Sequence, residues 1–302
     1  MTSSTAPEHR YVHTRGIRLH VQVQGPADAP LVLLIHGFAG GHFDWDEIMS
    51  EFRADADIPV RLAAVDLRGY GRSDKTPRGY DLTTAASDMC GAIRALGHTD
   101  ALVVGHGEGG LVAWTMSAHE PQRVSGIITL ASAHPLALAR NNLTHPVSQW
   151  SRIRASLFAQ LPRLPERALR KDNSAIVADS FRQQVAPGFR DTETCRKHQD
   201  LRREGMQIDK VPHLSCEYRR WTLRSRLRPE GGDFNRTIPK HTDAPALCVD
   251  GSMDPAYTPK ISRRSAARGG DGSGTELLYG VGHFPHIEDP PAVAALIRRT
   301  LS

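Results

Sequence analysis

One stretch of the chain, residues 102–114, constrains the fold more than any other, and it reads LVVGHGEGGLVAW. The apolar run at its start predicts a buried strand, and the apolar residues at its end predict a helix. Between them, Gly105, Gly109 and Gly110 let the strand and the helix pass close together through a tight turn. A turn with this Gly-x-x-x-Gly frame presents a catalytic Ser, Cys or Asp at its central position. That position holds Gly107, which has no side chain with which to attack a substrate.

Apolar runs and amphipathic stretches alternate through the rest of the chain. The run at residues 30–35 is apolar almost throughout, which is typical of a strand covered on both faces. We expect further strands at residues 11–15, 17–24, 61–65, 124–130, 245–249 and 275–279. We expect helices at residues 45–52, 82–96 and 291–301. Because strands alternate with helices, the sequence predicts an α/β fold with a mostly parallel central sheet and helices on both faces.

The segment from residue 134 to residue 240 differs from the rest in composition. It contains 21 Lys and Arg but only 11 Asp and Glu, whereas the whole chain has a formal net charge of +5. Prolines break this segment into several expected helices. We therefore predict a helical cap at 134–240, inserted into a core made of residues 1–133 and 241–302. Such an insertion would cover the carboxyl ends of the strands, where parallel sheets place their binding sites.

Length and composition narrow the class of protein. A chain of 302 residues suits one large domain or a domain with an insertion. No apolar run reaches the ~18–20 residues of a membrane span, and we expect no signal peptide. The four scattered cysteines predict reduced thiols and a cytoplasmic protein. We interpret the basic cap as a solvated helical surface that can also attract a membrane surface, and we expect no nucleic-acid partner. The sequence indicates no oligomeric state.

Four sequence blocks occur in an order typical of one large family. They are His36-Gly37-Phe38, a Gly-punctuated loop at 66–75, the turn at 105–110, and a pair formed by 251–254 and 282–284. On these blocks the chain resembles the α/β-hydrolase superfamily, specifically its capped epoxide-hydrolase-like branch, which includes epoxide hydrolases of actinobacteria. The resemblance covers nearly the whole chain from Arg15 onward and implies the α/β-hydrolase fold with an inserted helical cap.

The resemblance implies a role for each position that matches the family's motifs. Asp254 takes the place of the triad acid, and His283 takes that of the base. An Asp bonded to one imidazole nitrogen fixes the tautomer and leaves the other nitrogen to accept a proton. The backbone N–H groups of Phe38 and Glu108 are implied as the oxyanion hole. Position 107 holds Asp in epoxide hydrolases and Ser in esterases of this family, so Gly107 removes the nucleophile while its partners are kept.

Three aromatic residues are candidates for contact with a substrate. The segment Cys216–Arg219 resembles the cap segment in which epoxide hydrolases carry a tyrosine that donates to the epoxide oxygen. This resemblance implies the same role for Tyr218, and the alternative is a tyrosine that packs in the core. The family's second tyrosine is not evident, because no Tyr lies between Tyr80 and Tyr218. Trp45 and Phe284 are interpreted as aromatic residues of the pocket wall or of the core, and the sequence does not separate these two interpretations. We expect no cofactor and no metal site, because the histidines show no ligand spacing such as His-Glu-x-x-His.

Three interpretations follow from a kept Asp–His pair beside an absent nucleophile. In the first, the protein lacks the usual covalent hydrolysis and binds a small molecule or a partner as a pseudoenzyme. In the second, His283 activates a water molecule for direct attack on an ester or an epoxide. In the third, Gly107 was introduced in place of the Ser or Asp of an active enzyme. Both the Asp and the Ser codon reach Gly by one base change, so Gly107 does not indicate which nucleophile was lost.

Overall fold

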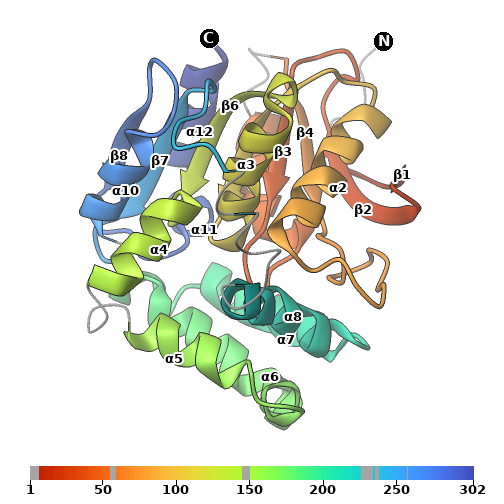
Figure 1. The fold of residues 1–302 in the computed structure, drawn as a ribbon, viewed down its shortest axis with the longest axis vertical. Coiled ribbons are helices and arrows are strands. Elements are labelled where there is room, and N and C mark those ends of the chain that lie inside the picture. The colour runs from red at the N-terminus through yellow and green to blue at the C-terminus, as the bar shows by residue number, and fades with distance from the viewer. Residues whose placement is uncertain (1–6, 55–58, 145–149, 226–233, 235–237, 257) are drawn as a thin grey trace.

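The computed structural model describes residues 7–54, 59–144, 150–225, 234, 238–256 and 258–302. Within these residues, eight strands form one sheet in the order β1-β2-β4-β3-β5-β6-β7-β8 (Figure 1). The strands are β1 (Glu8–Thr14), β2 (Ile17–Gln24), β3 (Leu31–Ile35), β4 (Arg61–Val65), β5 (Ala101–His106), β6 (Val124–Leu130), β7 (Ala246–Gly251) and β8 (Gly274–Leu278). The pairs β1–β2 and β2–β4 are antiparallel, and every later pair is parallel. This confirms the mostly parallel sheet that the sequence predicts.

Helices cover both faces of this sheet. α2 and α3 pack side by side on one face, and α1 and α12 pack together on the other (Figure 1). The helices are α1 (Asp46–Ala54), α2 (Leu82–Ala95), α3 (Glu108–His119), α4 (Pro135–Thr144), α5 (Trp150–Phe158), α6 (Leu164–Gln184), α7 (Glu193–Gln207), α8 (Val211–Arg224), α10 (Pro259–Ala266), α11 (Pro285–Glu288) and α12 (Pro290–Leu301). Short 3-10 turns are η1 (His42–Trp45), η2 (Pro121–Arg123) and η3 (Pro187–Phe189).

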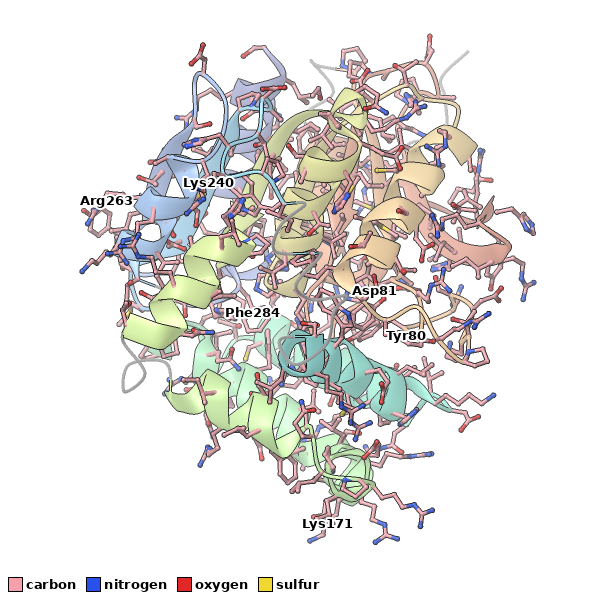
Figure 2. The ribbon with its side chains drawn as sticks, in the orientation of Figure 1. Tyr80, Asp81, Lys171, Lys240, Arg263 and Phe284 are labelled. Carbon is pink, nitrogen blue, oxygen red and sulfur yellow. The ribbon has the colours of Figure 1, made fainter. Side chains whose placement is uncertain are left out.

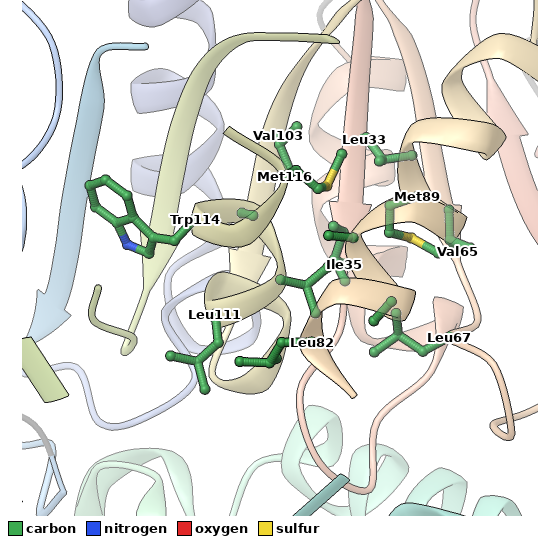
Figure 3. Close-up of a cluster of buried hydrophobic side chains, with 14 of the residues drawn as sticks. Leu33, Ile35, Val65, Leu67, Leu82, Met89, Val103, Leu111, Trp114 and Met116 are labelled. Carbon is green, nitrogen blue, oxygen red and sulfur yellow. The ribbon is translucent and has the colours of Figure 1, made fainter. Parts of the chain in front are cut away.

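The position of β3 in the middle of the sheet explains why its sequence is apolar at every position. Leu33 and Ile35 belong to the apolar cluster under α2 and α3, part of which Figure 3 shows. Val32 and Leu34 belong to the cluster under α1 and α12. All four side chains are fully buried. Because successive side chains of a strand point to opposite faces, a strand with helices on both sides must be apolar throughout.

The chain between β6 and β7 forms the helices α4 to α8. Helices α5 to α8 pack on one another beyond the ends of the strands, in the lower part of Figure 1. The backbone of α6 is not helical at residues 171–174, and Asp172, Asn173 and Ser174 have positive φ there. Lys171 lies at the outer tip of these helices, away from the sheet (Figure 2). The helices lie within the segment that the composition singles out, and the domain division at residues 134 and 240 stays a prediction.

Most predicted elements occur with shifts of a few residues. β4 and β6 have the expected bounds 61–65 and 124–130. The helix expected over 45–52 instead begins as the 3-10 turn η1, and α1 starts at Asp46. Asp46 and Glu47 favour a helix start there, because carboxylates stabilise the positive end of the helix dipole. Among the described residues, no helix is long and apolar enough to cross a membrane.

Candidate active site

The turn between β5 and α3 places Gly107 at the edge of the sheet. Its backbone has φ +52° and ψ −112°, and Gly107 is partly accessible to solvent. A Cβ atom on Gly109 would collide with the carbonyl oxygen of Ile35, so the close passage of helix and strand requires glycine at 109. A Cβ atom on Gly107 would meet only the Cα atom of Gly37 within 4 Å, at 3.8 Å. The turn therefore has room for a side chain at the one position where the family places its nucleophile.

The predicted acid and base meet across the ends of β7 and β8. The imidazole Nδ1–H of His283 donates to Oδ2 of Asp254 over 2.8 Å. The Asp254 side chain has no exposed surface and also accepts a hydrogen bond from the backbone N–H of Ala256 at 2.7 Å. The His283 side chain keeps 12% of its surface exposed. This hydrogen bond fixes the orientation and the tautomer of the His283 ring.

A half-buried carboxylate orders the loop that carries His283. Glu288 of α11 accepts hydrogen bonds from the backbone N–H groups of Gly282, Phe284 and Ala186, at 2.8–3.0 Å. The backbone N–H of His283 itself donates to the carbonyl of Gln184 at 2.9 Å. Burial raises the pKa of Glu288, and the three N–H groups act in the opposite direction. Because Gln184 is the last residue of α6 and Ala186 lies just beyond it, the helical segment helps to hold His283 in position.

The two predicted oxyanion donors make no hydrogen bond within the part of the chain that the structure describes. Neither the N–H of Phe38 nor that of Glu108 has a hydrogen-bond partner among the described residues. Ser132 explains the direction of the second donor, because its hydroxyl donates to the carbonyl of Gly107 at 2.6 Å. The C=O and N–H of a trans peptide point in opposite directions, so this bond turns the Glu108 N–H away from Ser132. Glu108 begins α3, where the first N–H groups have no partner in the helix.

Arg219 of α8 connects the helical segment to both oxyanion residues. Its Nε lies 3.2 Å from Oε1 of Glu108, and its guanidinium carbon lies 3.5 Å from the centre of the Phe38 ring. The acidic Glu108 next to position 107 is the only signal for this contact that the sequence offers. Arg219 lies in the Cys216–Arg219 segment, but the sequence alone does not predict its contacts with Glu108 and Phe38.

The predicted epoxide donor, Tyr218, is buried on α8. Its hydroxyl donates to the carbonyl of Arg68 at 3.1 Å, and its side chain packs against the rings of Tyr70 and Tyr80. Tyr70 is a residue that the sequence analysis missed, although it lies in the 66–75 block. Its hydroxyl is buried with no hydrogen-bond partner among the described residues. Burial raises the pKa of Tyr70 well above its usual value, and the charge of nearby Glu108 acts in the same direction.

The structure separates the two predicted pocket-wall residues. Phe284 lies beside His283, with ring centres 5.1 Å apart, and packs on Phe181 of α6 at 4.6 Å. Figure 2 shows Phe284 between the sheet and the helices of the inserted segment. Trp45 is fully buried in the core under α1 and α12, where its ring lies 4.6 Å from His286. The contact of Trp45 with a substrate stays a prediction that this buried position does not support.

Comparisons with known proteins identify the family of this chain. The chain is 35% identical over 170 residues to epoxide hydrolase 3 of Xenopus tropicalis, a match covering 55% of this chain and 45% of that protein. It is 34% identical over 167 residues to the AB hydrolase superfamily protein YfhM of Bacillus subtilis, covering 54% and 57%. The chain thus spans about half the length of these curated relatives.

Solved structures show the same fold over the whole chain. An epoxide hydrolase variant from Bacillus megaterium, complexed with a naphthyloxy-propanediol product, matches with TM-score 0.77 and 21% identity over 97% of this chain and 99% of that one. Cfl2 of Burkholderia cenocepacia matches with TM-score 0.80 and 21% identity, over 99% and 97%. The profile described as the alpha/beta hydrolase family matches residues 32–296, which is most of the sequence. This confirms the resemblance seen in the motifs: the chain belongs to the alpha/beta hydrolase family and is epoxide-hydrolase-like.

Proposed function

We propose that this protein is an epoxide-hydrolase-like member of the family in which covalent hydrolysis is lost. One observation carries the proposal: position 107 is glycine, with open space where a nucleophilic side chain would lie. Around that space stand the Asp254–His283 pair and the N–H groups of Phe38 and Glu108. Loss of a triad nucleophile lowers turnover by about 10⁶-fold in a well-studied hydrolase. The site is thus built to bind and polarise a small molecule without bonding to it.

Restoring the nucleophile tests this proposal. In Gly107→Asp, the new carboxylate would bond to an epoxide carbon while the carbon–oxygen bond breaks and the ring oxygen takes a proton. Water activated by His283 would then hydrolyse the resulting ester. We expect Gly107→Asp to open styrene oxide, and Gly107→Ser to cleave p-nitrophenyl acetate, each far faster than the Gly107 protein. The control is Gly107→Asp combined with His283→Ala, which should accumulate the alkyl ester, detected by intact-protein mass spectrometry.

One result would contradict the proposal outright. If the Gly107 protein forms a covalent adduct with either substrate, another side chain supplies the nucleophile. If it turns the substrates over as fast as the restored variants without an adduct, hydrolysis does not need a side chain at position 107. Inactive restored variants that keep the native circular dichroism spectrum would also count against it, because the remaining groups would then not form a working site.

A second candidate function is hydrolysis by direct attack of water. The intact hydrogen bond between His283 and Asp254 favours it, because this pair orients an imidazole to accept a proton. A water molecule beside Gly107 would lose a proton to Nε2 of His283 and attack an ester or epoxide carbon. The N–H groups of Phe38 and Glu108 would stabilise the developing oxyanion. Any activity of the Gly107 protein should then vanish in His283→Ala, and an unchanged rate in that variant would exclude this route.

We further propose a binding role for the inserted segment, residues 134–240, as a cap. Arg219 supports it, because this residue contacts the two oxyanion residues from α8. As a pseudoenzyme, the protein would bind a small molecule or a partner under this cap. The affinity for a naphthyloxy-propanediol, measured by calorimetry, should be lower in Arg219→Ala than in the unchanged protein. Equal affinity for the variant would count against the role of the cap.

We also propose a reducing, cytoplasmic location. Its support is that all four cysteines are buried thiols without disulfides, and that burial raises the pKa of Cys90 to about 12. Thiols held in this way are unreactive. Mass spectrometry after expression in an oxidising compartment should still find four thiols.

A surface role for the basic cap would appear as salt-sensitive binding to anionic phospholipid vesicles.

A further inference from the structure

Three histidines that are far apart in sequence meet at the edge of the sheet, outside the candidate active site. His9 lies on β1, His20 lies on β2, and His42 begins η1. Their ring centres are 4.6–5.3 Å apart, and one nitrogen of each ring lies within 4.8 Å of the nitrogens of the other two. The closest pair is Nδ1 of His9 and Nε2 of His20, at 3.0 Å.

The register of the first hairpin creates half of this cluster. His9 pairs with Gln22 and Tyr11 pairs with His20, so the two histidines are diagonal neighbours on one face of the β1–β2 pair. His42 reaches the same face from the loop after β3. Because the three histidines come from separate segments of the chain, their spacing in the sequence matches no metal-binding motif.

Asp66 holds two of the three rings from behind. Its Oδ2 accepts the Nδ1–H of His20 at 2.8 Å, and its Oδ1 accepts the Nδ1–H of His42 at 3.0 Å. The backbone N–H groups of Arg72 and His42 fill the remaining positions of this fully buried carboxylate, at 3.0 and 2.8 Å. Both rings thereby carry their proton on Nδ1, so each Nε2 presents a lone pair. An imidazole oriented by a carboxylate on its far nitrogen is the usual arrangement of a histidine that binds a metal.

We propose that His9, His20 and His42 bind one divalent transition-metal ion, for which Zn²⁺ is the probe. Three imidazole nitrogens without a thiolate suit Zn²⁺ and its neighbours rather than Mg²⁺ or Ca²⁺. Tetrahedral Zn–N bonds of about 2.0–2.1 Å place ligand nitrogens about 3.3 Å apart. The observed separations of 3.0 Å and at most 4.8 Å approach this value. The exposed His9 closes the remaining distance by rotation of its side chain, and solvent takes the fourth position.

Such an ion would join the first strand to the loop of the candidate active site. His42 follows Phe38 by four residues. A hydrogen bond from Gly40 N–H to Gly37 O closes the turn that contains Phe38, and one from Asp44 N–H to Gly41 O closes the turn that contains His42. Bound metal therefore fixes the end of the segment that carries one oxyanion donor. It also anchors β1, the outermost strand of the sheet.

Titration of the untagged, EDTA-treated full chain with Zn²⁺ tests this site. We expect one equivalent of Zn²⁺ by calorimetry, visible absorption bands of a tetrahedral site with Co²⁺, and a higher melting temperature with Zn²⁺ than without it. His9→Ala removes an exposed ligand and leaves the fold intact. It should weaken Zn²⁺ binding by more than the about 10–100-fold that loss of an outer partner costs. The matched control is His13→Ala, because His13 is an exposed histidine on the same strand.

Four results would overturn the proposal. Wild-type protein that binds no stoichiometric Zn²⁺ has no such site. Equal affinity of His9→Ala and the wild type, or equal losses in His9→Ala and His13→Ala, would show scattered surface binding only. His42→Ala is the second variant, since it removes a ligand from a different element, and wild-type affinity in this variant would also exclude the site.

Discussion

Replacement of Gly107 by alanine measures how much the turn depends on glycine. At φ +52° and ψ −112°, a residue with a side chain is strained, and such backbone strain costs about 1–3 kcal/mol. The added Cβ atom would meet only Gly37 Cα at 3.8 Å, which is an ordinary van der Waals contact and adds no steric term. We therefore expect Gly107→Ala to fold and to lower the free energy of unfolding by about 1–3 kcal/mol.

Two glycine variants separate strain from steric exclusion. Gly16→Ala lies in the β1–β2 turn at φ +79°, with no atom within 4 Å of its new Cβ, so it carries strain alone. Gly109→Ala drives its Cβ into the carbonyl oxygen of Ile35 and should cost clearly more than either. Urea unfolding followed by far-UV circular dichroism compares the three. If Gly107→Ala loses as much unfolding free energy as Gly109→Ala, the claim of open space beside Gly107 is wrong. If Gly107→Ala loses no unfolding free energy, the claim of backbone strain at this position is wrong.

Two further perturbations test the surroundings of the site. Burial raises the pKa of Asp250 to about 7, so the folded protein holds a proton there that the unfolded chain releases near pH 4, and stability falls as pH rises between these values. Asp250→Asn should abolish this dependence of stability on pH. At pH 8 the variant should be more stable than the wild type by up to about 4 kcal/mol, measured by urea titrations at several pH values. Parallel plots of unfolding free energy against pH for the two proteins would contradict this prediction. Arg219→Met should lower the free energy of unfolding by about 1–2 kcal/mol, through loss of its contacts with Glu108 and Phe38. A double-mutant cycle with Glu108→Gln checks this, and strictly additive losses would show that the ion pair contributes nothing.

The sequence determined the layers of the fold and the order of its motifs. The bounds of β4 and β6 could be predicted because both strands are mostly apolar and buried, and each lies between polar segments. The meeting of Asp254 and His283 could be inferred from the resemblance, and it occurs because β7 and β8 are parallel neighbours whose carboxyl ends share one edge. The absence of a side chain at position 107 was legible directly, since that residue is glycine.

Only the tertiary structure decided which distant side chains touch. Tyr218 bonds to the carbonyl of Arg68, which precedes it by 150 residues, and Trp45 turns into the core rather than toward His283. Neither outcome follows from local pattern, because helix rotation and loop path set the direction of each side chain. The same reason applies to Arg219 at the oxyanion residues. Hydrophobic periodicity encodes which face is buried, whereas contacts between polar groups depend on register and packing that form only when the whole chain has folded.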